Sequence, residues 1–433
     1  MPSRRPSLDA VAQHAPGTGT QEAVRPDSGR IVGVDVARAL AVFGMFTVHL
    51  GVGASGLLSD PAMETLHDLA RGRSSALFAF LAGVSIALLS GRTVPLTGPP
   101  LHRAAARILV RAVILALLGG LLDLLDTPIA IILAYYGGFF LLALPLLRLR
   151  APALAAIAVG IGLLGPQVSY LLRSVLGEEG ARQGSIGGIT DLLLTGYYPV
   201  CTFMAFVVAG MAVGRLDLRA VSTRVGLAAT GLGLVLLGYG GSWVLLRPLG
   251  VLDRLVVAEM TAYGYYGPGD TAFLSDADLG PLRAWMVEQI ASLHGTVPTT
   301  SPLWLLVASP HSGTSFEVAG ATGTALMVLA ACLVAADLLG RGLYPLFAAG
   351  SMALTLYTGH ILVLAVTDAD YGPLSGCPLE AFVVGGLLFA TLWRALLGRG
   401  PLERALAVVG EAAARNVAPE PAVPRSAPRK PGV

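Results

Sequence analysis

Long apolar runs separated by short polar segments fill the chain between residues 30 and 411. A helix that crosses the hydrocarbon core of a bilayer needs about 20 mostly apolar residues, and about ten runs approach that length. The pattern therefore predicts an all-α fold, a polytopic transmembrane helical bundle of about ten spans. The predicted spans are Ile31–Val52, Ser74–Ser90, Ala104–Leu124, Pro128–Leu147, Ala151–Leu172, Tyr197–Val213, Val225–Leu246, Ser315–Leu339, Pro345–Val366 and Leu379–Leu397.

Three segments lie outside this apolar pattern. Residues 1–29 are rich in Pro, Gly and Ser and lack the apolar stretch of a signal peptide, so we expect a disordered cytoplasmic tail. Residues 412–433 are rich in Pro and Arg, and we expect a second disordered cytoplasmic tail there. Between the tails, the transmembrane domain of residues 30–411 carries one long outer loop at residues 247–312. Within that loop, residues 281–295 have the spacing of an amphipathic helix, which we expect to lie on the membrane surface or cap the bundle.

The composition agrees with a membrane protein. Hydrophobic residues make up 54% and charged residues 13% of the chain, and the mean hydropathy is +0.71, whereas a soluble domain carries roughly 25% charged residues. Arginine gathers in alternate connections and in both tails, which predicts a multi-pass protein of the plasma (inner) membrane with both termini cytoplasmic. The formal net charge of +2 argues against nucleic-acid binding. The three cysteines have no metal-type spacing, and we expect no metal site.

The first apolar run carries ionisable residues at both ends. Asp35 and Arg38 lie near its start and His49 near its end, and these positions share one helical stripe with residues 42 and 45. At 1.5 Å rise per residue, Asp35 and His49 would lie about 21 Å apart along the axis. Because ionisable groups at membrane depth usually face a protein interior or a cavity, we expect the stripe to face the bundle, with Asp35 and Arg38 as candidate substrate-binding residues.

Four of the seven histidines fall in the predicted outer half of the membrane or just above it, namely His49, His67, His311 and His360. A neutral imidazole can accept and return a proton near neutral pH, and it can also act as a nucleophile. Each of the four can equally be a helix-end histidine bonded to backbone or water, whereas His14, His102 and His294 are interpreted as solvated. The candidate partners at the same level are Asp123, Asp126, Tyr135, Tyr136 and Glu317.

Two groups of arginines invite a functional interpretation. Arg71 and Arg73 precede an apolar helix on the outer side, where they would hold an anionic substrate or serve as interfacial anchors. Arg103, Arg107 and Arg111 recur every four residues at a predicted cytoplasmic helix end. They would bind a nucleotide-bearing acyl donor or simply obey the positive-inside rule. The segment Pro310–Thr314, PHSGT, would leave backbone N–H groups free for an oxyanion.

Several segments together resemble a known family. They read GVDVARALAVFGMFTVH, GRSSALFAFLAGVSIAL, ILAYYGGFFLLALPLL, AAGSMALTLYTGHILV and LGRGPLERAL. They resemble the YeiB-like family of bacterial polytopic membrane proteins, a domain of unknown function with transport suggested, and SMALTLYTGH and RGPLE are the most specific segments. The N-terminal half is also similar to the heparan-α-glucosaminide N-acetyltransferase-like transmembrane acyltransferases. That resemblance implies transfer of an acetyl group from cytosolic acetyl-CoA to an amino sugar on the far side. It also implies a central histidine, which His67 matches best and His49 next, although the Trp-Asn-Gly stretch of those enzymes is missing.

Two functions therefore stay open. The first is a membrane acyltransferase that moves an acyl group from cytosolic acyl-CoA, a co-substrate rather than a tightly bound cofactor, to an outer-side sugar or lipid-linked acceptor. His49 or His67 would carry the acyl group, His311 or His360 would act as base, and PHSGT or Arg73 would stabilise the oxyanion. The alternative is a transporter or exporter of a small or lipid-linked substrate, in which Asp35, Arg38 and His49 line the path. A non-catalytic membrane scaffold is a third interpretation.

Overall fold

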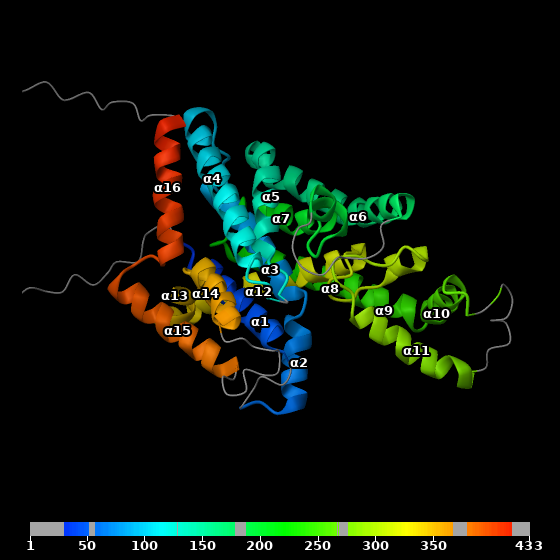
Figure 1. Ribbon diagram of the computed structural model, residues 1–433. Helices are drawn as coiled ribbons and strands as arrows, with labels where there is room; N and C mark the ends of the chain where they lie inside the picture. Colours follow the sequence, from blue (N-terminus) through cyan, green and yellow to red (C-terminus); the bar gives the residue numbers. More distant parts are fainter. Residues whose placement is uncertain are drawn as a thin grey trace, which may run out of the picture. The chain divides into compact units, whose positions relative to one another are not determined.

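The computed structural model describes residues 30–51, 57–127, 129–177, 188–265, 267, 276–366 and 379–417. The chain divides into two compact units, Met1–Ile31 and Val32–Val433, and everything below concerns the second. Its described residues are helical and contain no strand (Figure 1). The α-helices are α1 (Val32–Leu50), α2 (Asp60–Ala70), α3 (Arg73–Leu89), α4 (Gly98–Asp123), α5 (Ile132–Ala143), α6 (Ala151–Leu176), α7 (Val200–Gly214), α8 (Val221–Val235), α9 (Gly241–Leu246), α10 (Val251–Ala262), α11 (Asp276–Ala291), α12 (Ser315–Leu339), α13 (Tyr344–Gly350), α14 (Ala353–Val366), α15 (Leu379–Leu396) and α16 (Pro401–Val417).

Within the described residues, seven helical segments are long and apolar enough to cross a membrane. This confirms the all-helical, multi-pass membrane architecture. Three shorter apolar helical segments, Ile132–Arg148, Val200–Gly214 and Ala353–Val366, coincide with further predicted spans. The total of about ten spans and the orientation of the termini stay predictions. The seven are Val32–Leu50, Asp60–Leu89, Gly98–Asp123, Ala151–Leu176, Val221–Leu246, Ser315–Gly350 and Leu379–Leu396.

Helices α3 and α7 pack main chain against main chain. A Cβ atom added at Gly83 would overlap the carbonyl oxygen of Val207, and one added at Gly210 would overlap the carbonyl oxygen of Phe80. Small residues at helix crossings allow this approach, which lipid alone would not drive. Around this contact, α1, α5, α6 and α12 complete a buried centre in which Phe80, Phe139 and Phe206 are fully enclosed.

The predicted span over Pro345–Val366 is wrong as one continuous helix. The chain ends α13 at Gly350, turns through Ser351 and Met352, and begins α14 at Ala353. The carboxylate of Glu403 stabilises this break, because it accepts the backbone N–H groups of Leu354 at 2.9 Å and Thr355 at 3.0 Å. It also accepts the Thr355 hydroxyl at 2.6 Å. Glu403 therefore satisfies orphan donors of the first turn of α14 from the start of α16.

Helix α16 packs along α4 (Figure 1), and Arg107 donates to the Glu411 carboxylate at 3.0 and 3.2 Å across that contact. The pKa of Glu411 is lowered by the Arg107 guanidinium. Helix α16 extends through Val417, so the C-terminal tail predicted from residue 412 begins as an ordered helix. The apolar face of an amphipathic helix, with Leu406, Gly410 and Ala414 buried, explains this extension.

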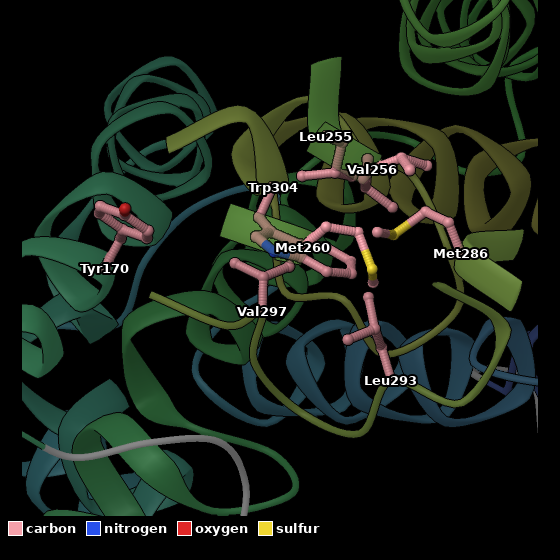
Figure 2. Packing of buried hydrophobic residues seen from close by; sticks show 9 residues of the cluster. Tyr170, Leu255, Val256, Met260, Met286, Leu293, Val297 and Trp304 are labelled. Atoms are coloured by element: carbon pink, nitrogen blue, oxygen red, sulfur yellow. The ribbon is translucent and has the colours of Figure 1, made fainter. Parts of the chain in front are cut away.

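The long loop predicted at residues 247–312 contains a small helical cap. Its described part carries α10, α11 and a 3₁₀ turn at Pro302–Leu306. A helix does form in the predicted segment, but it runs from Asp276 to Ala291, so it begins earlier than predicted and ends before Leu293. Only part of α11 has one apolar face, where Leu282, Trp285, Met286 and Ile290 pack in a common core with α10. Figure 2 shows Met260, Met286, Leu293 and Trp304 gathered in the core of this cap. Within that core, the Glu259 carboxylate accepts the indole N–H of Trp304 at 2.5 Å.

Candidate functional site

Two of the four candidate histidines form a direct pair, called the His pair below. His49 ends α1 and His360 lies on α14, and the His49 Nδ1 and His360 Nε2 atoms lie 2.8 Å apart. The rings are stacked, with centroids 5.1 Å apart and an interplanar angle of 13°. Phe46 and Tyr357 enclose the His360 ring at centroid distances of 4.6 and 5.1 Å. A hydrogen bond this short between two imidazoles requires that one nitrogen donates and the other accepts, so the pair shares one proton.

The other ring nitrogen of His360 is buried. Its side chain is 4% exposed, and Nδ1 makes no hydrogen bond of good geometry among the described residues, although the backbone of Leu356 and Tyr357 lies near it. Buried polar atoms are rarely left without a partner, and exceptions gather where water or a ligand binds or where chemistry occurs. The buried Tyr136 hydroxyl also has no hydrogen-bond partner among the described residues. The ring of Tyr136 lies 5.5 Å from that of Phe78, which in turn stacks on the ring of Tyr357.

His311 belongs to a second imidazole group, carried by loops. Its ring lies 6.4 Å from that of His294, nearly parallel at 15°, and 5.5 Å from that of Tyr197. His294 in turn lies 5.1 Å from Tyr197. We call His294 and His311 the loop histidines.

Glu317 holds the loop that bears His311. Its carboxylate accepts the N–H of His311 at 3.1 Å and that of Gly313 at 3.0 Å, while Thr314 caps α12 by accepting the Glu317 N–H at 3.2 Å. The backbone of His311 has φ 61°, a left-handed conformation that costs a residue other than glycine about 1 kcal/mol or more. The Glu317 clamp holds that conformation in place.

The same clamp overturns one prediction. We expected the Pro310–Thr314 segment to offer free backbone N–H groups to an oxyanion. Instead, the N–H groups of His311 and Gly313 bind Glu317, and that of Ser312 binds the Ser309 carbonyl at 3.1 Å. The motif is a helix-entry structure in which the available amides stabilise the α12 start.

The loop histidines are neutral at physiological pH. Burial lowers the pKa of His311 to about 3, and the nearby charges of His294, Arg71 and His49 act in the same direction. Burial and the Arg71 charge also lower the pKa of His294.

Arg71 and Arg73 sit at the junction of α2 and α3, beside this group. Arg71 donates to the Ala291 carbonyl at the end of α11, which joins the cap to the α2–α3 turn. Arg73 donates to the Asp68 carbonyl at 2.6 Å and stacks on the Tyr239 ring at 4.7 Å. Between them, Gly72 has φ 69°, and a Cβ there would lie 2.9 Å from Pro310 Cβ. The turn and the His311 loop are therefore in direct contact.

The remaining candidate residues of the predicted outer side differ in whether they lie near the loop histidines. The hydroxyl of Tyr135 accepts the N–H of Tyr197 at 3.0 Å, which brings Tyr135 against the loop histidines. His67 lies on α2, 3.8 Å from Asp68, and bonds to none of the other candidate histidines within the described residues. Asp126 occupies an exposed turn with φ 51°, and its side chain bonds to no described histidine. Its predicted place beside the histidines is therefore wrong, because the turn after α4 directs it to the surface.

Asp35 and Arg38 lie at the opposite end of α1 from the His pair. They form an ion pair at 2.5 Å, and Arg38 also donates to Ser85 at 2.7 Å. Asp35 is 2% exposed, which agrees with a stripe facing the bundle. Because the pair is 11 or more residues from His49 on one straight helix, it belongs to a separate region of the molecule. Of the predicted nucleotide-binding stripe on α4, Arg107 is bound to Glu411, while Arg103 and Arg111 flank that contact.

Sequence reasoning missed four residues that the structure brings to functional positions. His294, interpreted as solvated, stacks on His311, and Tyr197 and Tyr198 surround the same ring at 5.5 and 6.0 Å. Glu403 anchors the helix that carries His360. The only signal for Glu403 was the RGPLE segment itself, and nothing local in the sequence relates it to residue 355.

Residues 30–245 match the family model described as heparan-alpha-glucosaminide N-acetyltransferase, catalytic. No curated protein matches the chain. The match supports a transmembrane acetyltransferase-like domain and agrees with the second resemblance drawn from the sequence. It contains His49, His67 and Arg71 and ends within α9, so His294, His311 and His360 lie beyond it. The two most specific segments of the YeiB-like resemblance lie past residue 245, and that resemblance stays a prediction.

Proposed function

We propose that the protein is an acyltransferase of the bacterial inner membrane. It would move an acyl group from cytosolic acyl-CoA to a hydroxyl or amine, sugar or lipid-linked, on the outer side. The observation that carries the proposal is the 2.8 Å contact between His49 Nδ1 and His360 Nε2, which gives an α1 histidine within the matched domain a dedicated proton partner. A nucleophile hydrogen-bonded to a base is the arrangement that covalent acyl transfer needs.

The chemistry follows from the proton position. With the proton on His49 Nδ1, donated to His360, the Nε2 lone pair of His49 is free to attack the thioester carbonyl. The carbon–sulfur bond breaks, and the Nδ1 proton passes through His360 to the leaving thiolate, which leaves a neutral acyl-imidazole and a thiol. The acceptor hydroxyl or amine then attacks the acyl carbon, its proton enters at His360 Nδ1, and the Nε2 proton of His360 returns to His49 Nδ1, which restores both starting tautomers. The proton count is the same at the end as at the start.

The surroundings of the pair suit this role. Phe46 and Tyr357 enclose the ring of His360, so the proton that it shares with His49 is kept away from bulk water. His294 is only partly buried beside His311 and could take the proton of an incoming amine or hydroxyl. Arg71, tied to the cap at Ala291, places a positive charge close to His294.

The test uses the full chain in liposomes with radiolabelled acetyl-CoA on the side of the predicted cytoplasmic face. Label should appear on the protein or on an amine trapped on the far side, and His49→Ala should abolish it. His102→Ala, an exposed histidine at the start of α4, is the matched control and should keep full labelling. If label transfer survives His49→Ala and is lost in His67→Ala, the nucleophile is His67. Substrate flux with no label from any short acyl-CoA would favour the transporter alternative.

A further inference from the structure

A groove of about 340 Å³ lies on the surface of the molecule over the contact between α6 and α7. It follows α6 from Gly160 to Val168, which is about 12 Å of helix rise. Ligand pockets in proteins span roughly 300 to 1,000 Å³, so the groove has room for part of a small molecule. Apart from the Cys201 thiol its lining is hydrocarbon, and the aliphatic side chains are those of Ile161, Leu164, Val168, Val200 and Met204.

Two glycines of α6 explain why the groove exists. A Cβ atom added at Gly165 would overlap the carbonyl oxygen of Cys201, so the main chains of α6 and α7 touch at that point. Little more than one turn earlier, no described atom lies within 4 Å of the Cβ position of Gly160. The two helices therefore meet at Gly165 and leave a hollow beside Gly160, which a larger side chain would fill.

The groove opens toward the bilayer. It lies within α6, which is long and apolar enough to cross a membrane. The side chains of Leu164 and Val168 are 66% and 46% exposed, and exposed aliphatic side chains of a spanning helix face lipid. One leaflet of the hydrocarbon core is about 15 Å thick, so a groove about 12 Å long matches most of one lipid tail. A single hydrocarbon chain is therefore the ligand whose chemistry and length fit.

The first turn of α7 connects the groove to the loop histidines. Val200 lines the groove, whereas Thr202 packs against the loop that bears His311, with its methyl group 3.5 Å from the Cβ position of Gly313. Just before this turn, the ring of Tyr198 lies 6.0 Å from that of His311. The groove and the loop histidines thus lie on neighbouring sides of one helical turn, separated by about the width of a helix, roughly 10 Å.

We propose that this groove, between Gly160 on α6 and Val200 on α7, holds the hydrocarbon tail of the acyl acceptor. The acceptor is then a lipid with an amine or a hydroxyl in its head, and this step rests on the proposed function. Because lipid tails are as apolar as the groove, a tail gains close packing there but no hydrophobic free energy. Selection among lipids therefore falls to the head, which the first turn of α7 places beside the loop histidines.

The test measures contact with the tail and acyl transfer separately. Full-length protein in phosphatidylcholine nanodiscs receives a small fraction of one lipid that carries a photoreactive diazirine in its tail. This lipid is phosphatidylethanolamine, with an amine head, glucosyl diacylglycerol, with hydroxyls, or phosphatidylcholine, with neither group. Crosslinked peptides are mapped by mass spectrometry. In parallel, radiolabelled acetyl-CoA is offered with each lipid, or with ethanolamine or glucose, which are the same heads without a tail.

Two variants block the groove, and each has a matched control. Gly160→Leu fills the hollow, and Leu164→Gln places an amide in it. Gly233→Leu is the control for the first, because no described atom lies within 4 Å of its Cβ position on another spanning helix segment. Leu163→Gln is the control for the second, since this neighbouring leucine is 58% exposed and does not line the groove. Thermal unfolding of all four variants verifies that they fold.

We expect a lipid with an amine or hydroxyl head to crosslink to the groove segments of α6 and α7 more than phosphatidylcholine does. Gly160→Leu and Leu164→Gln should lower that crosslinking and raise the KM for the lipid about tenfold, because they overpack the site or place an unpaired amide against the tail. Transfer to ethanolamine or glucose should not change in these variants. The two controls should behave like the parent protein in every assay.

Equal crosslinking by all three lipids would show that the groove holds bulk lipid and would overturn the proposal. Crosslinking unchanged in Gly160→Leu would overturn it too, as would a homodimer that Gly160→Leu dissociates, because a second copy would then fill the groove. Label transfer to tail-free acceptors but to no lipid would keep the proposed function and overturn the lipid acceptor. Head-selective crosslinking that Gly160→Leu abolishes, without label transfer to any acceptor, would keep the lipid site and refute the proposed function.

Discussion

The His pair and the loop histidines each bring two imidazole rings together, but by different means. His49 and His360 stand on helices of the bundle, and helix packing sets their 2.8 Å contact. His294 and His311 stand on loops, and His311 keeps a left-handed backbone through the Glu317 clamp. The first arrangement fixes a proton-transfer distance, whereas the second is anchored in loops that also carry the cap. If the proposed function holds, chemistry would belong to the helix-borne pair and contact with the acceptor to the loop-borne group.

The largest expected difference is in catalysis. We predict that His49→Ala lowers the rate of label transfer by a factor of about 10² to 10⁴, because the nucleophile or base is lost. His294→Ala should lower it by less than about tenfold, mainly through the KM for the acceptor. Steady-state rates in liposomes measure both. Equal losses in the two variants would end the distinction between the groups.

The second prediction concerns the clamp. Glu317→Ala should lower the free energy of unfolding by roughly 2 to 4 kcal/mol, because it leaves the buried N–H groups of His311 and Gly313 without acceptors. Thermal unfolding of the purified protein in detergent measures this loss of stability. Glu64→Ala, an exposed glutamate on α2, should leave the melting temperature within a degree or two. A Glu317→Ala protein as stable as the parent would show that the loop holds its shape unaided.

The third prediction tests the contact between the α2–α3 turn and the His311 loop. Gly72→Ala should cost about 1 to 2 kcal/mol of stability, since its φ is 69° and the new Cβ would press on Pro310. Gly120→Ala is the matched control, because nothing lies within 4 Å of its Cβ position on α4 and alanine favours a helix. A neutral Gly72→Ala would mean that the two loops move apart freely.

The smallest predicted effect is on pH dependence. The folded protein keeps His311 neutral, with a pKa of about 3, while the unfolded chain takes up a proton near its ordinary value of 6.5. Stability is therefore fully present above pH 6.5 and falls below it, by about 1 kcal/mol between pH 7 and 5.5 for this one group. His311→Gln should flatten that part of the profile in melting experiments across the same range. A profile unchanged by the substitution would contradict the burial of this imidazole.

The sequence predicted most of the helical architecture and about half of the site. Apolar runs located each major helix, because length and hydropathy are local properties, and α1 was found with its buried stripe. The break at Ser351–Met352 was invisible, since Glu403, 48 residues from Thr355, stabilises it. The stacking of His294 on His311 likewise depends on how the cap folds back. PHSGT was misinterpreted because its free amides were inferred without the carboxylate three residues beyond it in Glu317.

The main-chain contact between α3 and α7 has a mechanical consequence. Slippage of one helix along the other by a single residue would drive a side chain into a carbonyl at Gly83 or Gly210. Helices α3 and α7 must therefore move as one rigid body in any conformational change. Helix α14 is held by side chains instead: Glu403 binds its first turn, the Tyr357 hydroxyl accepts the N–H of Ile132 at 3.4 Å, and His360 meets His49. The place of His360 therefore depends on individual side chains, any of which a single substitution can remove, whereas the α3–α7 crossing is fixed by the main chain itself.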